Sequence, residues 1–270
     1  MNKKYVHGYS PRETQRLREQ SLIIEEILHG DTSYPIGSLV LEPGCGVGAQ
    51  TAILARRSPQ AKITSIDTSE ESLQEAQTIV NSLGIKNVRF VKSDIMGMTF
   101  AQESFDHVFV CFVLEHLDDP LKALGRLRTV LKPGGSITVI EGDHGSFFWH
   151  PETAESQKVW QCLITIQKGL GHDPLIGRKL FPLLSGAGFK VQNISPRWIY
   201  ADDSFYKLRS EGIYKIMIPM LQASRGQALE LKLIDEITWD KGIEDLRLAA
   251  KYREGTFFYT WFKAVAQNPQ

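Results

Sequence analysis

Three acidic residues stand at the carboxyl ends of three successive segments that have the composition of β-strands. They are Glu42, Asp67 and Asp94. Taken singly, each acid is as consistent with a helix cap or a solvated loop residue as with a ligand contact. In a parallel sheet, however, the carboxyl ends of the strands meet at one edge, so three acids in this position predict a single ligand-binding groove.

A glycine-rich turn follows the first of these segments. The stretch GCGVG, Gly44 to Gly48, lies between an apolar run and a helical pattern, and glycine there lets a ligand approach backbone N–H groups closely. Gly44, Gly46 and Ala49 also satisfy the dinucleotide fingerprint G-x-G-x-x-G/A, so an NAD-dependent oxidoreductase is an alternative. A carboxylate at Glu42 would repel a pyrophosphate but suits a ligand with an ammonium or sulfonium group. S-adenosylmethionine carries both.

The segments that position these residues alternate between strand and helix patterns from residue 37 to 140. Strands are expected at SLVLEP, KITSID, VRFVKSD, HVFVCFV and SITVIE, with helical stretches between them. This alternation is typical of right-handed βαβ units and a parallel sheet covered on both faces. Ser69 is expected to cap one helix, and Asp118 or Asp119 followed by Pro120 to begin another.

Five motifs in this order resemble the class I S-adenosylmethionine-dependent methyltransferases of the Rossmann-like, small-molecule type. The motifs are VLEPGCGVGAQT, ITSIDTSEESL, VRFVKSDIMGMTF, FDHVFVCFVLEHL and LRTVLKPGGSITVIE. The resemblance implies an α/β fold, a three-layer sandwich with a mostly parallel seven-stranded sheet. It also implies an antiparallel last strand, which GTFFYTWFKA can supply.

The resemblance implies S-adenosylmethionine as cofactor, S-adenosylhomocysteine as product, and contacts at defined positions. Cys45 is expected to be a small residue of the turn rather than a nucleophile. An N-terminal helix of the kind that covers the cofactor in some family members is weighed evenly against one that only packs on the core. The implied contacts are Glu42, Gly44, Cys45 and Gly46 for the methionine part, Asp67 and Thr68 for ribose, Asp94 and Ile95 for adenine, Cys111 and Phe112 as a wall, and Tyr9, Arg16 and Gln20 from the N-terminal helix.

Candidate catalytic residues come from the polar turn EGDHGS, which follows the fifth strand at the mouth of the expected pocket. Glu141, Asp143 and His144 can bind a substrate amine, and His144 can accept a proton near neutral pH. The alternative is a polar loop with a capping Asp143. Methyl transfer is an in-line displacement at an already activated methyl group, so no catalytic residue is obligatory and none is assigned. No spacing typical of metal ligands stands out, and no metal is expected.

The expected organisation is a single methyltransferase domain over residues 1–270. It comprises an N-terminal helical lid (1–30), a Rossmann-like core (36–200 and 255–266) and a helical cap insertion (201–254). Aromatic residues are concentrated after Gly145. Many of them are expected to be core residues, and some in the cap can line an apolar or aromatic substrate pocket. Together with the insertion, this favours a small metabolite over a macromolecule as the substrate.

The composition narrows the class of partner. Lys plus Arg and Asp plus Glu both number 31, so the net charge is zero, which disfavours nucleic-acid binding. Cysteines without CxxC spacing and the lack of a long apolar run predict a cytoplasmic protein without a membrane partner. A monomer or a homodimer is expected, and the sequence does not decide between them. An RNA or protein methyltransferase and a non-enzymatic binder with this fold are the alternatives. The acceptor atom, nitrogen, oxygen or carbon, does not follow from the sequence.

Overall fold

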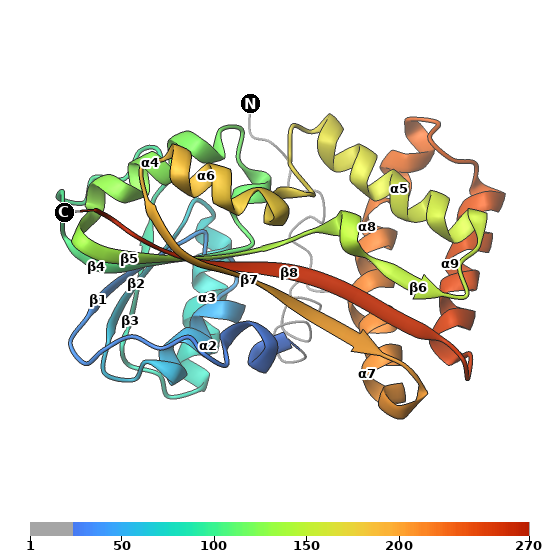
Figure 1. Cartoon of the computed structure of the whole chain (residues 1–270), viewed down its shortest axis with the longest axis horizontal. Helices are drawn as coiled ribbons and strands as arrows, with labels where there is room; N and C mark the ends of the chain where they lie inside the picture. Colours follow the sequence, from blue (N-terminus) through green and yellow to red (C-terminus); the bar gives the residue numbers. More distant parts are fainter. Residues whose placement is uncertain (1–23, 270) are drawn as a thin grey trace. The chain divides into compact units, whose positions relative to one another are not determined.

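The computed structural model describes residues 24–269, which divide into two compact units (Figure 1). The core unit holds Glu25–Gly142, Leu175–Arg197 and residues 261–269. The helical unit holds Asp143–Pro174 and Trp198–Thr260. The expected lid, core and cap boundaries stay a prediction.

The core unit is built on a mostly parallel sheet, with a strand order of β3-β2-β1-β4-β5-β8. β8 is antiparallel to β5, as expected for the last strand, and the α/β fold class is confirmed. Among residues 24–269 the sheet has eight strands rather than seven, because the short β6 also pairs with β8. The strands are β1 (Leu39–Pro43), β2 (Lys62–Asp67), β3 (Val88–Lys92), β4 (Phe105–Cys111), β5 (Leu131–Gly142), β6 (Phe148–His150), β7 (Lys190–Ala201) and β8 (Thr256–Gln267).

Helices cover both faces of the core sheet, with α2 and α3 on one face and α4 and α6 on the other (Figure 1). The two predicted caps are present. The Ser69 hydroxyl accepts from the N–H of Ser72 at 3.1 Å, and the Asp119 carboxylate accepts from the N–H of Lys122 at 2.9 Å, with Pro120 as first helical residue. The helices of this unit are α2 (Ala49–Arg57), α3 (Glu70–Ser82), η1 (Leu114–His116), α4 (Pro120–Val130), η3 (Ile176–Lys179) and α6 (Leu180–Gly186), and residues 24–29 are also helical.

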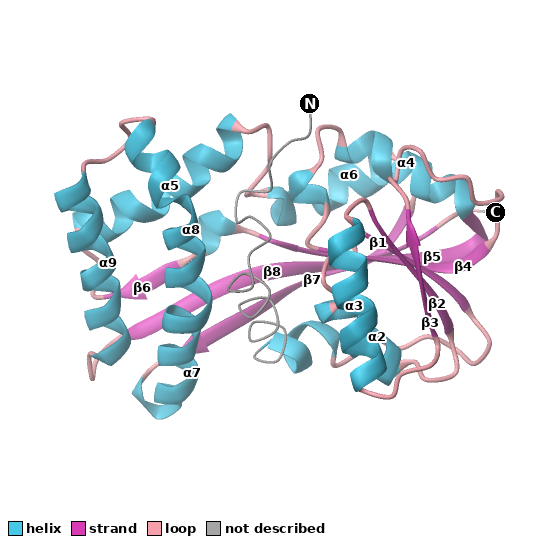
Figure 2. Cartoon of the chain, turned by 180° about the vertical axis from the view of Figure 1, so that it is seen from behind, coloured by secondary structure: helices cyan, strands magenta, loops and turns pink. Residues whose placement is uncertain are grey.

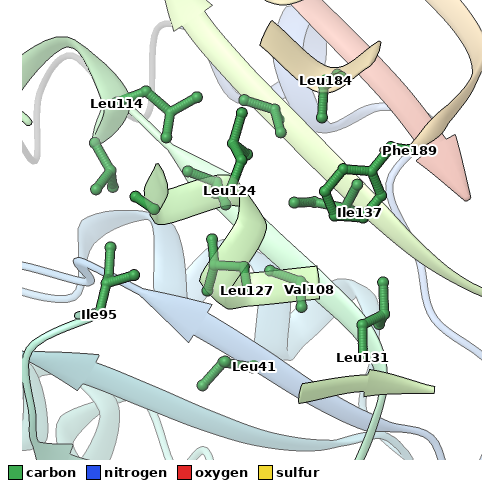
Figure 3. Packing of buried hydrophobic residues seen from close by; sticks show 14 of the residues in the cluster. Leu41, Ile95, Val108, Leu114, Leu124, Leu127, Leu131, Ile137, Leu184 and Phe189 are labelled. Carbon is green, nitrogen blue, oxygen red and sulfur yellow. The ribbon is translucent and has the colours of Figure 1, made fainter. Parts of the chain in front are cut away.

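Apolar residues spaced three or four apart fix α4 on the sheet. Leu124 and Leu127 are fully buried and face Val108 of β4 and Ile137 of β5 (Figure 3). Burying a leucine side chain of this kind contributes about 1.5–3 kcal/mol, so the packing holds β4 and β5 in register. The two strands that lead into the turns after β4 and β5 are therefore fixed on one apolar core.

The helical unit packs helices on its strand segments (Figure 2). Thr153 and Ser156 form a capping box that begins α5. Next to it Phe147 stacks on Trp160, with ring centroids 4.4 Å apart, and both are buried. The elements are η2 (His144–Ser146), α5 (Ala154–Gly169), η4 (Asp203–Phe205), α7 (Tyr206–Glu211), the π-helix η5 (Gly212–Met217), α8 (Ile218–Glu230) and α9 (Glu236–Lys251), and β7 and β8 contribute residues to both units.

The aromatic residues concentrated after Gly145 divide into two sets. One set, from β6, α5, α9, β8 and the turn before β6, lies in the interior of the helical unit: Phe147, Trp149, Trp160, Trp239, Phe257 and Tyr259 are each at most 7% exposed. Others are exposed, among them Phe148, Trp198, Tyr200 and Phe205. Within residues 24–269, no helix has the length and apolar composition needed to cross a bilayer.

Candidate cofactor site

The sheet has a topological switch point beside β1. β1 pairs with β2 on one side and with β4 on the other, so the chain runs outward to β3 and then returns to β4. Crevices at the carboxyl ends of strands beside such a point are the usual ligand sites of open α/β sheets. The turns after β1 and β4 border this crevice.

The turn after β1 is held by hydrogen bonds to β2. The Gly44 N–H donates to the Ile66 carbonyl at 2.7 Å. Gly44 has φ 69°, and a Cβ there would lie 2.7 Å from a methyl of Val113, so no larger residue fits. Gly46 has φ 51°, and no described atom lies within 4 Å of the position that its Cβ would take. Gly44 therefore packs against the turn after β4, and the space beside the Cα of Gly46 is open to a ligand.

Glu42 lies beneath this turn and is 2% exposed. One of its carboxylate oxygens accepts from the hydroxyls of Ser65 at 2.6 Å and Thr51 at 2.7 Å. The pKa of Glu42 is raised to about 7, mainly by burial and to a smaller extent by the nearby Asp67, while the two hydroxyl donors oppose the shift. A carboxyl group poised in this way binds a cationic group much better once it is ionised.

Asp67 ends β2 and is held by backbone donors on the same edge. Its Oδ2 accepts from the Gly46 N–H at 2.8 Å and its Oδ1 from the Ser69 N–H at 2.9 Å. A carboxylate has about four lone-pair positions, so two remain after these bonds. The geometry fits a pair of neighbouring hydroxyl groups, as on a ribose, and Thr68 beside it is exposed.

The residues after β3 place one polar group outward and one apolar group inward. Asp94 is exposed, and its carboxylate accepts from the Met96 N–H at 2.6 Å. Ile95 is 8% exposed and joins the apolar cluster under the sheet (Figure 3). The Asp94 carboxylate is thus fixed by its own turn at the edge of the crevice.

The turn after β4 is strained. Phe112 has φ 58°, a left-handed conformation that costs a bulky residue energy, and its N–H donates to the Ile140 carbonyl at 3.0 Å. Cys111 before it is buried, and burial raises the pKa of its thiol well above the usual value. Burial also raises the pKa of the Cys45 thiol, which disfavours the thiolate and fits a packing role in the turn.

The three candidate catalytic residues are buried rather than exposed in a polar loop. Glu141 belongs to the core unit and is 0% exposed, and its Oε1 accepts backbone N–H groups from the turn after β4. Asp143 and His144 belong to the helical unit. Asp143 caps η2 by accepting from the Gly145 N–H at 3.0 Å, and His144 Nδ1 lies 2.8 Å from the Tyr259 hydroxyl.

The structure thus brings the predicted cofactor contacts from Glu42 to Phe112 to the carboxyl edge of one sheet. Tyr9, Arg16 and Gln20 lie outside the described residues. The contact of Glu141 with the turn after β4 was not predicted, because backbone donors leave no sequence signal. Among residues 24–269, no group of three or more His, Cys, Asp or Glu side chains is placed to hold a metal ion.

Comparison with known proteins decides the family. The profile described as Methyltransferase domain matches residues 37–194, more than half of the chain. The chain belongs to the class I S-adenosylmethionine-dependent methyltransferases. The family predicted from the five motifs is confirmed, and with it methyltransferase as the enzyme class and S-adenosylmethionine as the cofactor of this family.

Two curated relatives are similar to part of this chain. An uncharacterized methyltransferase of Schizosaccharomyces pombe is 29% identical over 177 residues, which cover 62% of this chain and 63% of that protein. Demethylmenaquinone methyltransferase of Staphylococcus aureus is 33% identical over 124 residues, which cover 46% of this chain and 51% of that protein. The methyltransferase spans less than two thirds of the length of either relative.

Solved structures share the fold over nearly the whole chain. One is Haemonchus contortus phosphoethanolamine N-methyltransferase 2, solved in complex with phosphomonomethylethanolamine and S-adenosylhomocysteine. Its TM-score is 0.58 at 17% sequence identity, and the match covers 97% of this chain and 59% of that protein. The YcgJ protein of Bacillus subtilis has a TM-score of 0.55 at 15% sequence identity, and the match covers 94% of this chain and 98% of that protein. Identities this low establish a common fold.

Proposed function

We propose that this methyltransferase transfers a methyl group from S-adenosylmethionine to a small-molecule acceptor. The observation that carries the proposal is that two carboxyl groups, Glu42 and Asp67, lie at the ends of neighbouring strands, next to the open space beside the Cα of Gly46. A dinucleotide pyrophosphate on this turn would face the Glu42 carboxylate. An amino acid ammonium group or a sulfonium in the same place would be attracted to it.

Each side of the crevice then has a part of the cofactor to hold. Glu42 and the Gly44–Gly46 backbone receive the methionine part, and the remaining lone pairs of Asp67 accept the ribose hydroxyls, beside Thr68. Asp94 and Ile95 hold adenine, and Cys111 and Phe112 form the wall at the end of β4. The residues present fit the cofactor in charge and in hydrogen-bonding capacity.

The bound cofactor supplies a methyl group that its sulfonium already activates toward displacement. The chain has to align the acceptor in line with the methyl–sulfur bond and keep water out of the site. Asp143 and His144 stay candidates for moving the proton that leaves a nitrogen or oxygen acceptor, whereas Glu141 is fully buried and its Oε1 accepts backbone N–H groups. No general base is required where the acceptor already presents a lone pair.

Two observations support a small acceptor. The chain has no net positive charge to draw it to nucleic acid, and the demethylmenaquinone and phosphoethanolamine methyltransferases are named for small-molecule substrates. We also propose a cytoplasmic monomer or homodimer. The three buried free cysteines are compatible with a reducing compartment.

The proposal is tested by S-adenosylhomocysteine production from methyl-labelled S-adenosylmethionine. The purified protein is incubated with a fractionated metabolite extract, with total RNA, or with a protein extract, and Asp67→Ala serves as the inactive control. We expect label to move into a low-mass metabolite fraction only. Transfer into RNA or protein would replace the small-molecule proposal with a macromolecular one.

A further inference from the structure

A buried carboxyl group holds the turn that follows β4. The Glu141 Oε1 accepts from the Leu114 N–H at 2.7 Å and from the Val113 N–H at 3.0 Å. Glu141 stands on β5 one residue after Ile140, which pairs with Cys111 at the end of β4. The side chain therefore reaches across from one strand end to the next.

Glu141 takes the place of a helix cap. The first N–H groups of a helix have no partner within the helix, and the usual partner is a side chain at the N-cap. Val113 is the N-cap of η1, and its side chain makes no capping hydrogen bond. Because Glu141 is 0% exposed, water cannot easily replace it.

The turn that Glu141 holds contacts the glycine turn. The two methyl groups of Val113 lie 2.7 and 2.9 Å from the position that a Cβ of Gly44 would take. The strained Phe112 precedes Val113 in the same turn. Loss of the Glu141 acceptor would leave two buried donors without a partner and free this strained segment to move away from Gly44.

We propose that Glu141 is a positioning residue, whose carboxyl oxygen holds the Val113–Leu114 turn against Gly44 and so fixes the part of the glycine turn that receives the methionine end of the cofactor. The inference rests on the proposed function. In this role, Glu141 acts by accepting the hydrogen bonds of the Val113 and Leu114 N–H groups at Oε1. Contact with the acceptor substrate is not part of this role.

Two substitutions of Glu141 separate the effect of its hydrogen-bond acceptor from the effect of its charge. The Glu141 Oε2 has no hydrogen-bond partner among the described residues, so Oε1 alone holds the turn. Burial and the neighbouring Glu115 raise the pKa of Glu141 well above its usual value, which favours the neutral acid. Glu141→Gln keeps a neutral side chain with one carbonyl oxygen, whereas Glu141→Leu has similar size and no acceptor.

The test is calorimetric titration of the wild type and both variants with S-adenosylhomocysteine and, separately, with adenosine. Adenosine lacks the methionine part, and in the proposed site it is held by Asp67, at the end of β2, and by Asp94, in the turn after β3. We expect Glu141→Leu to weaken S-adenosylhomocysteine binding about tenfold or more, and adenosine binding less than about threefold. Glu141→Gln should stay within about threefold of the wild type for both ligands.

Three results would overturn the inference. The first is that Glu141→Leu binds S-adenosylhomocysteine with wild-type affinity. The second is that this variant loses affinity for S-adenosylhomocysteine and for adenosine equally. The third is that Glu141→Gln binds S-adenosylhomocysteine as weakly as Glu141→Leu does. If Glu141→Leu does not fold, Val113→Ala takes its place, because it removes the contact with Gly44 but keeps the N–H donor. We expect this variant to lose affinity for S-adenosylhomocysteine and to keep its affinity for adenosine. Failure of the wild type itself to bind S-adenosylhomocysteine would instead refute the proposed function.

Discussion

Glu42 shows how a single residue can link cofactor binding to pH. Its carboxyl group is nearly fully buried, and burial raises its pKa to about 7. The form that attracts a cationic ligand is the ionised one, and the ionised fraction falls about tenfold for each pH unit below the pKa. Near neutral pH, this residue is therefore divided between a binding and a non-binding form.

The affinity for S-adenosylmethionine should depend on pH through Glu42. We expect binding to be about tenfold weaker at pH 6 than at pH 8, because most Glu42 is protonated at the lower value. Calorimetric titration at both values measures this. Glu42→Gln should bind weakly with no such dependence, and a wild-type affinity that is flat over this range would contradict the role given to Glu42.

The same residue should lower stability as it ionises. The folded-state pKa is raised above the ordinary value of 4.5, so the folded chain keeps a proton that the unfolded chain loses between about pH 4.5 and 7. The free energy of unfolding therefore falls as pH rises through this window, by about 3 kcal/mol at most.

Glu42→Gln should remove the loss of unfolding free energy that accompanies ionisation of Glu42. In urea denaturation without cofactor, we expect the variant to be more stable than the wild type at pH 8 and nearly equal to it at pH 5. The variant loses function while gaining stability, a trade typical of binding sites. A variant that is less stable than the wild type at pH 8 would show that ionised Glu42 is well compensated by Ser65 and Thr51.

At the scale of elements, a buried lysine joins the end of the helix at residues 24–29 to β8. Lys263 is 3% exposed, and its ammonium group donates to the Leu28 carbonyl at 3.2 Å, the Thr32 hydroxyl at 2.5 Å and the Asp31 carboxylate at 2.6 Å. All three donors of the ammonium group are used. The helix end is thereby anchored on the strand next to β5.

Lys263→Met should lower the free energy of unfolding by about 2 kcal/mol or more, since it leaves buried acceptors without a donor. Lys132→Met is the matched control. Its ammonium group pairs with Asp106 at 2.6 Å, but both side chains are about a third or more exposed, so the loss should be below about 1 kcal/mol. Equal losses in the two variants, measured by denaturant unfolding, would contradict the anchoring role.

Elements with strong local signals were predicted well from the sequence. β2 has the bounds expected from KITSID, and the caps at Ser69 and Asp119 follow from local side-chain chemistry. The acids at strand ends also fall where a parallel sheet must place them. Local pattern decides these features because each depends on neighbours in the chain.

Several features set by pairing across the sheet were not predicted. β5 begins at Leu131 rather than at the expected Ser136, because Leu131 pairs with Phe105 before the glycines of the turn. β6 has only three residues, too few for a recognisable alternation. The burial of Glu141 also depends on a neighbouring strand, which no periodicity in the segment EGDHGS reports.

At the scale of the whole molecule, every described candidate for cofactor binding lies in the core unit, and the match to the methyltransferase domain begins at residue 37, just before β1. The core unit therefore contains all the described residues that we propose to bind the cofactor. Ligand binding to the folded chain alone stabilises it by about 2.7 kcal/mol at a hundredfold excess over the dissociation constant.

Saturating S-adenosylmethionine should accordingly raise the melting temperature of the whole chain. We expect a shift of a few degrees in the wild type, and little or none in Asp67→Ala. Thermal unfolding followed by circular dichroism measures this. An equal shift in the two proteins would mean that the ligand binds away from the carboxyl ends of β1 and β2.

The central claim is tested most directly by calorimetric titration with S-adenosylmethionine and, in parallel, with NAD. The comparison uses wild type, Asp67→Ala and Asp106→Ala. Asp106 is a matched control, because it also accepts a backbone N–H, that of Leu39 at 2.8 Å, but belongs to the opposite end of β4. The account predicts tight S-adenosylmethionine binding by wild type and Asp106→Ala, at least tenfold weaker binding by Asp67→Ala, and no heat with NAD. Binding of NAD without S-adenosylmethionine would contradict it and favour the oxidoreductase alternative.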